Sequence, residues 1–179
     1  AKIGFGVEKG DHWIDIGAHI GCFSKKVEYY HGTVSSYEPC KDNYDLLKKN
    51  IKGQSHNVAV GVKDDMVHLQ IGSKHYFNKV IGKGSTPQVS FESILTSGCC
   101  VKMDIEGAEI PIMDQCDFSK INKMVIAYHT NVDKSRDNLL QRVDRLKQWF
   151  DVTHQPIKQE HMNMFPNEVM IYCMKKDLD

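Results

Sequence analysis

Short hydrophobic runs alternate along the chain with longer segments whose apolar residues recur every three to four positions. The short runs have the length and composition of buried strands and cover 13–16, 33–37, 57–60, 99–104 and 123–128. The segments between them have helical periodicity and cover 21–27, 42–51, 91–95 and a stretch that starts at residue 108. This alternation predicts an α/β fold with a mostly parallel sheet and helices on both faces.

Two parts of the chain depart from the alternation. Residues 67–71 and 76–81 predict a β-hairpin, and the Gly- and Pro-rich residues 82–87 predict a loop after it. Near the C-terminus, 135–150 is predicted to be the longest helix and 169–174 a final strand. Because no crossover helix follows this strand, we expect an antiparallel pairing at that edge of the sheet.

Composition and charge favour a small partner molecule. The 179 residues are 41% hydrophobic and 26% charged, which suits one globular domain. Lys plus Arg (23) balances Asp plus Glu (23), so the whole chain offers no electrostatic argument for binding nucleic acid or an anionic membrane, and we expect neither partner. The basic residues of the 135–150 helix are interrupted by acidic ones and are interpreted as a solvated face.

The cysteines and the first residues suggest where the protein is found. The six cysteines lack the spacing of metal ligands and lie mostly in apolar runs, so we expect reduced, buried thiols and a cytoplasmic protein. The sequence begins with neither a signal-peptide pattern nor an initiating Met. We therefore expect residues 1–179 to be a single domain of a longer polypeptide that carries other domains.

The most informative segment runs from Asp15 to Gly21 and reads D-I-G-A-H-I-G at the turn from the first strand into the first helix. Gly17 would allow a sharp turn and close approach of the backbone to a ligand, and Gly21 would let the helix pack close to the sheet. Glu38 follows the second strand, where a carboxylate can accept hydrogen bonds from both hydroxyls of a ribose. Together these residues predict a nucleoside-containing cofactor.

A simpler interpretation makes the glycines ordinary turn residues and the two acids solvated strand ends. Either Asp15 or Glu38 alone would leave that interpretation ahead, and the pair favours a cofactor. A dinucleotide-binding oxidoreductase would require G-x-G-x-x-G after the first strand, whereas this chain has G-x-x-x-G from Gly17 to Gly21.

At Asp15 to Gly21 the sequence resembles the class I S-adenosylmethionine (SAM)-dependent methyltransferases. Two further segments resemble the FkbM type: Y-E-P at 37–39 is similar to its F-E-P element, and V-K-M-D-I-E-G-A-E at 101–109 to its L-K-I-D-V-E-G-A-E signature. N-V-A-V at 57–60 also resembles its N-V-A-L segment. The resemblance covers roughly residues 13–125 and departs from the family in the polar insertion at 67–88 and beyond residue 129.

This resemblance implies a Rossmann-like methyltransferase fold of about seven strands, with SAM across the carboxyl ends of the first strands. The residues that it assigns to cofactor binding are Asp15, Ile16, Gly17, Ala18, His19, Gly21, Glu38, Pro39 and Asp104. The implied activity is O-methylation of a sugar hydroxyl or a glycan. The alternatives are a catalytically silent binding module and a methyltransferase that acts on a non-sugar small molecule or on nucleic acid.

Methyl transfer from a sulfonium needs no protein nucleophile, but a hydroxyl acceptor needs a base that removes its proton. The catalytic candidates are Asp104, Glu106 and His129. His129 would act as a neutral imidazole with an ordinary pKa of about 6.5. A purely structural role for His129, as a polar cap on the end of its strand, is equally open. Asp104 and Glu106 also suggest a site for a hard cation such as Mg²⁺, although two carboxylates are few ligands for it.

Overall fold

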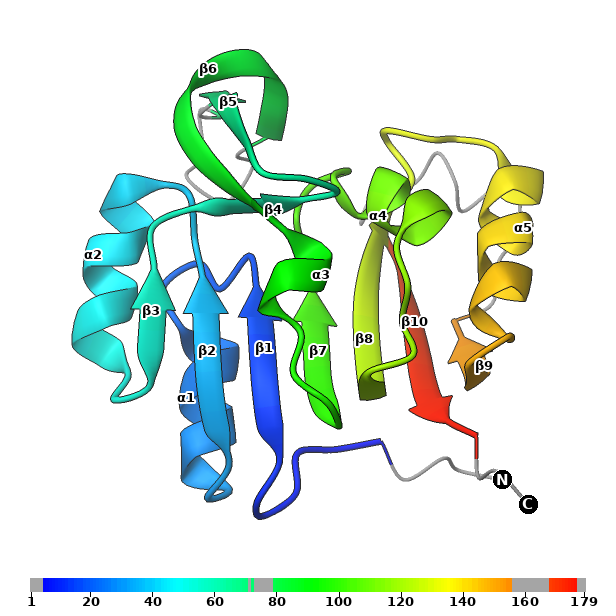
Figure 1. The fold of residues 1–179 in the computed structure, drawn as a ribbon, viewed down its shortest axis with the longest axis horizontal. Coiled ribbons are helices and arrows are strands. Elements are labelled where there is room, and N and C mark those ends of the chain that lie inside the picture. Colours follow the sequence, from blue (N-terminus) through cyan, green and yellow to red (C-terminus); the bar gives the residue numbers. More distant parts are fainter. Residues whose placement is uncertain (1–4, 71, 73–78, 156–167, 177–179) are drawn as a thin grey trace.

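The structure is a computed structural model that describes residues 5–70, 72, 79–155 and 168–176. Seven strands form the main sheet in the order β3-β2-β1-β7-β8-β10-β9 (Figure 1). Their bounds are β1 (His12–Ile16), β2 (Thr33–Tyr37), β3 (Gln54–His56), β7 (Cys99–Met103), β8 (Ile121–His129), β9 (Phe150–His154) and β10 (Glu168–Lys175). Strands β3, β2, β1, β7 and β8 pair in parallel, and β10 pairs antiparallel with both β8 and β9. The predicted fold class is confirmed.

Helices cover both faces of this sheet because successive strand residues point to opposite sides. The helices are α1 (Cys22–Tyr29), α2 (Lys41–Asn50), α3 (Phe91–Ile94), α4 (Glu109–Gln115) and α5 (Arg136–Leu146). On one face Ile14 of β1 joins the large core that also contains residues of α3, α4 and α5. On the other face the neighbouring Trp13 packs with Val27 of α1. In the described part of the chain no helix has the length and apolar character needed to cross a membrane.

A second, three-stranded sheet consists of β4 (Ala59–Gly61), β5 (Asp65–Gln70) and β6 (Lys79–Ser90) in the order β4-β6-β5. Figure 1 shows it beyond the carboxyl ends of β1, β2 and β7. The antiparallel β5–β6 pair confirms the predicted hairpin, although 71 and 73–78 lie outside the described residues. The strand predicted at 57–60 is confirmed only at 59–60, which belong to β4 of the second sheet, and the third strand of the main sheet on that side is β3 at 54–56.

The predicted loop at 82–87 is also wrong, because these residues lie within β6. The Gly- and Pro-rich composition fits a strand here for a local reason: the ladder with β5 shifts register at Val67. At Gly84 the two backbones approach so closely that a Cβ would lie 2.5 Å from the Cα of His68. Glycine in this strand therefore marks close backbone contact rather than a loop.

The C-terminal helix is shorter than predicted. Helix α5 ends at Leu146, and Phe150 begins β9 opposite Lys175 of β10. The apolar residues Leu139, Val143, Leu146 and Phe150 keep helical spacing, and all four are buried. Phe150 reaches the core from a strand, so periodicity alone could not locate the end of the helix.

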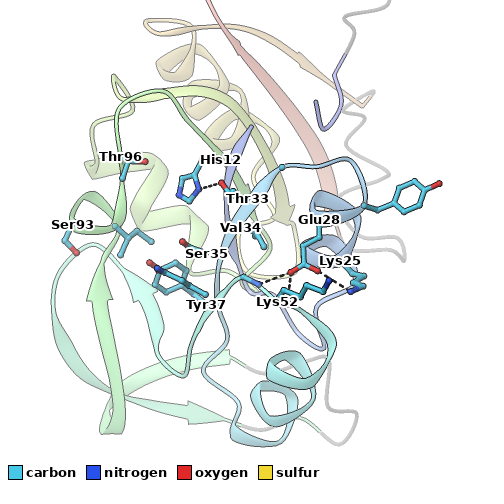
Figure 2. Close-up of a pocket in the computed structure, with 15 residues that line it drawn as sticks. His12, Lys25, Glu28, Thr33, Val34, Ser35, Tyr37, Lys52, Ser93 and Thr96 are labelled. Atoms are coloured by element: carbon cyan, nitrogen blue, oxygen red, sulfur yellow. Dashed lines mark hydrogen bonds and ion pairs between the residues drawn. The ribbon is translucent and has the colours of Figure 1, made fainter. Parts of the chain in front are cut away.

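A groove of about 1160 Å³ lies along β2, next to α3 (Figure 2). Figure 2 shows the ring of His12 bonded to Thr33 on one side, where Nδ1 and Oγ1 are 2.9 Å apart, and Glu28 beside Lys25 on another. Ser93 and Ile94 of the short helix α3 line the groove together with Thr33, which is exposed, and Ser35, which is half-buried. Thr33 is the first residue of β2, so much of this groove lies toward the amino end of the strand, opposite the edge where the predicted site residues gather.

Candidate active site

The predicted site residues lie at the carboxyl ends of β1, β2, β7 and β8. In the main sheet β1 has β2 as its neighbour on one side and β7, which comes much later in the chain, as its neighbour on the other side. In open α/β sheets, ligands bind at such a reversal of strand order. The loops that follow β1 and β7 meet there directly, since the backbone N–H of Asp104 donates to the carbonyl of Ile16 at 3.1 Å.

The loop after β1 turns at Gly17 as predicted. Its two glycines allow close contacts with other parts of the chain. Gly17 has φ +76°, and a Cβ there would lie 1.9 Å from the carbonyl oxygen of Asp104. Its close approach is therefore to the backbone that directly follows β7. At Gly21 a Cβ would lie 2.8 Å from Leu47 of α2, so this glycine permits helix–helix packing and not packing on the sheet. The N–H groups of Gly17 and Ala18 both donate to the carbonyl of Tyr37 at 3.0 Å.

Asp15 lies beneath this loop and does not face the open edge. Its side chain is 0% exposed, one oxygen lies 3.1 Å from the Nζ of Lys102, and the other accepts a hydrogen bond from Ser24 at 2.5 Å. Lys102 also donates to the carbonyl of Gly17 at 2.7 Å. Asp15 and Lys102 thus hold the loop from below, and the cofactor contact of Asp15 stays a prediction. Ile16 is buried as well, at 1% exposure.

Glu38 holds the same loop from the side of β2. Its Oε2 accepts the backbone N–H of His19 at 2.9 Å, and its Oε1 accepts that of Cys40 at 2.9 Å. The residue is 5% exposed, and this burial raises the pKa of Glu38 against the effect of the two donors. His19 has φ +51°, a conformation that the hydrogen bond to Glu38 stabilises. A ribose hydroxyl would have to use the remaining lone pairs of this carboxylate.

Asn57 is a supporting residue that the sequence did not reveal. Its Nδ2 donates to the carbonyl of Glu38 at 2.9 Å and to that of Pro39 at 3.0 Å. These bonds fix the backbone after β2, from which Glu38 projects. The N-V-A-V segment contains Asn57, but nothing in the sequence alone separates this amide from other loop asparagines.

The structure brings the three predicted catalytic residues together. The Nε2 of His129 lies 3.7 Å from Oδ1 of Asp104 and 3.5 Å from Oε2 of Glu106. Asp104 is the most open of the three, with 43% of its side chain exposed against 15% for Glu106 and 7% for His129. Glu106 has φ +55°, which places it in the left-handed region on the loop after β7.

His129 is held by a fourth residue, Glu109, through its other ring nitrogen. Oε1 of Glu109 lies 3.1 Å from Nδ1 of His129 and accepts the backbone N–H of the same residue at 2.7 Å. Burial alone would lower the pKa of His129, but the hydrogen bonds and charges of Glu106 and Glu109 outweigh it and raise this pKa to about 10. Such a pKa favours a protonated imidazole near neutral pH over the neutral form expected from the sequence, and the catalytic role of His129 stays a prediction.

Arg142 of α5 fixes the segment that follows His129. Its Nη1 donates to Oδ2 of Asp133 at 2.6 Å and to the hydroxyl of Tyr128 at 2.8 Å, and its Nε donates to Asp114 at 2.8 Å. Burial raises the pKa of Tyr128 to about 12. The interpretation of the α5 basic residues as a solvated face fails for Arg142, because its guanidinium crosslinks α4, α5 and the loop after β8.

The same three residues could hold a metal ion. Asp104, Glu106 and His129 each offer one ligand atom, and these atoms lie within 4.8 Å of one another. The sequence suggested only the two carboxylates, and folding adds the imidazole. Two oxygens and one nitrogen suit several divalent cations, since Mg²⁺ prefers oxygen and imidazole favours transition metals.

No protein-family model and no curated protein matches this chain. Several solved structures resemble it. A candidate RNA methyltransferase from Pyrococcus horikoshii has a TM-score of 0.53 and 15% identity, over 96% of this chain and 75% of that one. A TehB-like SAM-dependent methyltransferase from Corynebacterium glutamicum gives 0.52 and 10%, over 94% and 82%. The chain has the class I methyltransferase fold.

A candidate transferase from Pyrococcus horikoshii also has this fold, with a TM-score of 0.52 and 14% identity over 95% of this chain. The chain spans only 60% of the length of that protein. At such identities the likeness establishes the fold and leaves the FkbM type a prediction.

The prediction that excluded nucleic acid as a partner does not stand. Besides the RNA methyltransferase above, an rRNA methylase from Streptococcus thermophilus and fibrillarin in complex with Nop5p are among the structures that resemble this chain. Overall neutrality was the basis of that prediction. Net charge averages over the whole surface, whereas a nucleic acid contacts only one local part of it, so a balanced total excludes nothing.

Proposed function

We propose that this chain is a SAM-dependent methyltransferase that transfers the methyl group to a hydroxyl of a sugar ring, in a glycan, a small sugar or the ribose of a nucleic acid. The observation that carries the proposal is the meeting of two loops at the reversal of strand order. There the glycine turn after β1 touches the backbone of Asp104, whose carboxylate is 43% exposed beside His129.

The residues at this edge fit the proposed cofactor. A positively charged sulfonium would lie near the exposed carboxylate of Asp104, and the turn formed by Gly17 and Ala18 carries no large side chain. Glu38 and Pro39 would border the ribose. When bound, SAM supplies a methyl group that is already activated for transfer, so the protein has to orient the acceptor and take its proton.

Asp104 is the residue that we assign to the acceptor proton. His129 is protonated near neutral pH, and Glu106 is less exposed, whereas Asp104 offers an open carboxylate at the edge. A carboxylate within hydrogen-bonding distance of the hydroxyl can accept its proton as the new C–O bond forms. The role proposed for His129 is to hold Asp104 and Glu106 in place through the positive charge of its ring, since Nε2 lies 3.7 and 3.5 Å from their carboxylate oxygens.

A divalent cation is a further element of the proposal. Asp104, Glu106 and His129 would hold it, since their ligand atoms lie within 4.8 Å of one another. The ion would take the place of the Nε2 proton of His129, and Asp104 would then be a ligand and not the base. Such an ion would orient the acceptor oxygens and lower the pKa of the bound hydroxyl. Activity that is lost in excess chelator and restored by Mg²⁺ or Mn²⁺ would support this element. Full activity in chelator would contradict it and leave Asp104 as the base.

The proposal is tested by binding and by transfer. Calorimetry should detect S-adenosylhomocysteine (SAH) and give no comparable signal with NAD. Transfer of labelled methyl from SAM is then measured with nucleotide sugars, glycans and RNA, and the labelled product is digested to locate the methyl group. Asp104→Asn should retain SAH binding and lose about 10²- to 10⁴-fold in rate. Asp144→Asn, on an exposed part of α5, is the charge-matched control.

Three results would contradict the proposal in different ways. Absence of SAH binding would reject the cofactor. SAH binding without transfer to any acceptor, with and without divalent cations, would favour the silent binding module. Transfer exclusively to nitrogen or carbon would retain the methyltransferase and reject the hydroxyl acceptor.

A further inference from the structure

Glu109 is a fully buried acid that neither the cofactor nor an acceptor can reach. It is the first residue of α4 and 0% exposed. Its Oε1 accepts the backbone N–H of His129 at 2.7 Å and faces the Nδ1 of that ring at 3.1 Å. Its Oε2 accepts the N–H of Gly107 at 2.8 Å. One carboxylate thus joins the start of α4, the loop after β7 and the end of β8.

The contacts with His129 determine which ring nitrogen faces the site. A carboxylate accepts hydrogen bonds and does not donate them, so Nδ1 must carry the hydrogen in the bond to Glu109. Because the same oxygen also accepts the backbone N–H, the ring is fixed relative to its own main chain. The opposite nitrogen, Nε2, is left directed at Asp104 and Glu106, at 3.7 and 3.5 Å.

We propose that Glu109 is a positioning residue for methyl transfer, which acts by holding the imidazole of His129 with Nε2 toward the two carboxylates. This inference rests on the proposed function for its effect on rate. For histidines that ligate a metal, replacing the group that accepts a hydrogen bond from the other ring nitrogen typically costs about 10- to 100-fold in activity or metal affinity, and we expect an effect of that size here. The bond to Gly107 provides a competing explanation, in which Glu109 only stabilises the loop and the start of α4.

A double-mutant cycle separates the two explanations. Glu109→Gln keeps the size of the side chain and removes its charge, and the amide can accept from His129 or from Gly107 but not from both. We expect kcat to fall about 10- to 100-fold, with little change in KM for SAM or in SAH affinity. In a His129→Ala background the same substitution should have almost no further effect on kcat. Asp144→Asn again controls for the loss of one negative charge.

An equal fall in kcat in both backgrounds would overturn the proposal, because Glu109 would then act without His129. A rise in KM for SAM together with a loss of SAH affinity and a lower melting temperature would also overturn it, because that is the expected result of damage to the loop alone.

A spectroscopic measurement tests the positioning without activity. In the wild-type protein at fixed pH, proton–nitrogen NMR should show a slowly exchanging Nδ1–H that is absent in His129→Ala and shifted in Glu109→Gln. An Nδ1 without a proton in the wild type would overturn the proposal, even if Glu109→Gln failed to fold. A normal Nδ1–H signal with no methyl transfer to any acceptor would reject the proposed function while retaining the positioning.

Discussion

The protonation of His129 makes the sharpest quantitative prediction. A pKa that rises from about 6.5 in the unfolded chain to about 10 in the folded protein means that folding tightens proton binding. This stabilisation is fully present below about pH 6.5 and is lost as the pH rises through about 10. At about 1.36 kcal/mol per pKa unit, the whole shift corresponds to about 5 kcal/mol.

The perturbation is His129→Gln, compared with the wild type by urea unfolding between pH 6.5 and 10.5 in the presence of a chelator. The difference between the two free energies of unfolding cancels the other titrating groups. The wild type should have the higher free energy of unfolding at pH 6.5, and we expect most of this difference from the variant to be lost by pH 10.5. His154→Gln, at an exposed position in β9, controls for the replacement of a histidine in a strand. A ring-proton NMR titration of His129 gives the same pKa directly.

Parallel pH dependences of the wild type and His129→Gln would refute the reasoning, as would an NMR midpoint between 6 and 7. Either result would mean that the effect of Glu106 and Glu109 on the pKa of His129 does not outweigh the opposite effect of burial. His129 would then be restored as a neutral base, and Asp104 would lose its assignment as the proton acceptor.

Two further predictions concern the loop after β1. Gly17→Ala should lower the free energy of unfolding by about 2 to 4 kcal/mol and weaken SAH binding, because φ is +76° and the new Cβ would meet Asp104. Gly10→Ala, with φ +89° but open space, should cost only about 1 to 2 kcal/mol by the same denaturation assay, and equal costs would contradict the close contact. Glu38→Gln should weaken SAH binding by about 1.5 to 3 kcal/mol, because an amide cannot accept from both backbone N–H groups that Glu38 now holds. An unchanged calorimetric Kd would remove Glu38 from the cofactor site.

The order of the elements could be predicted from the sequence, because burial on one or both faces of an element sets the spacing of apolar residues along it. Short apolar runs predicted the strands, and apolar residues at helical spacing predicted helices at the places where α1, α2 and α4 lie. The same reasoning put Asp104 and His129 at strand ends on one edge of the sheet, since parallel strands end together. It failed at 82–87 and at Phe150, where the turn-like composition and the helical spacing had other causes in the tertiary structure.

Only the tertiary structure decided what each candidate residue contacts. Asp15 and Glu38 resembled cofactor ligands in sequence, yet the fold buries both and directs their oxygens to Lys102, Ser24 and backbone N–H groups. The protonation of His129 likewise depends on Glu109, a residue 20 positions earlier in the chain. Hydrophobic pattern is a property of neighbouring residues, so a sequence displays it. Solvent exposure and pKa depend on groups that come together only when distant segments fold, and no local pattern records them.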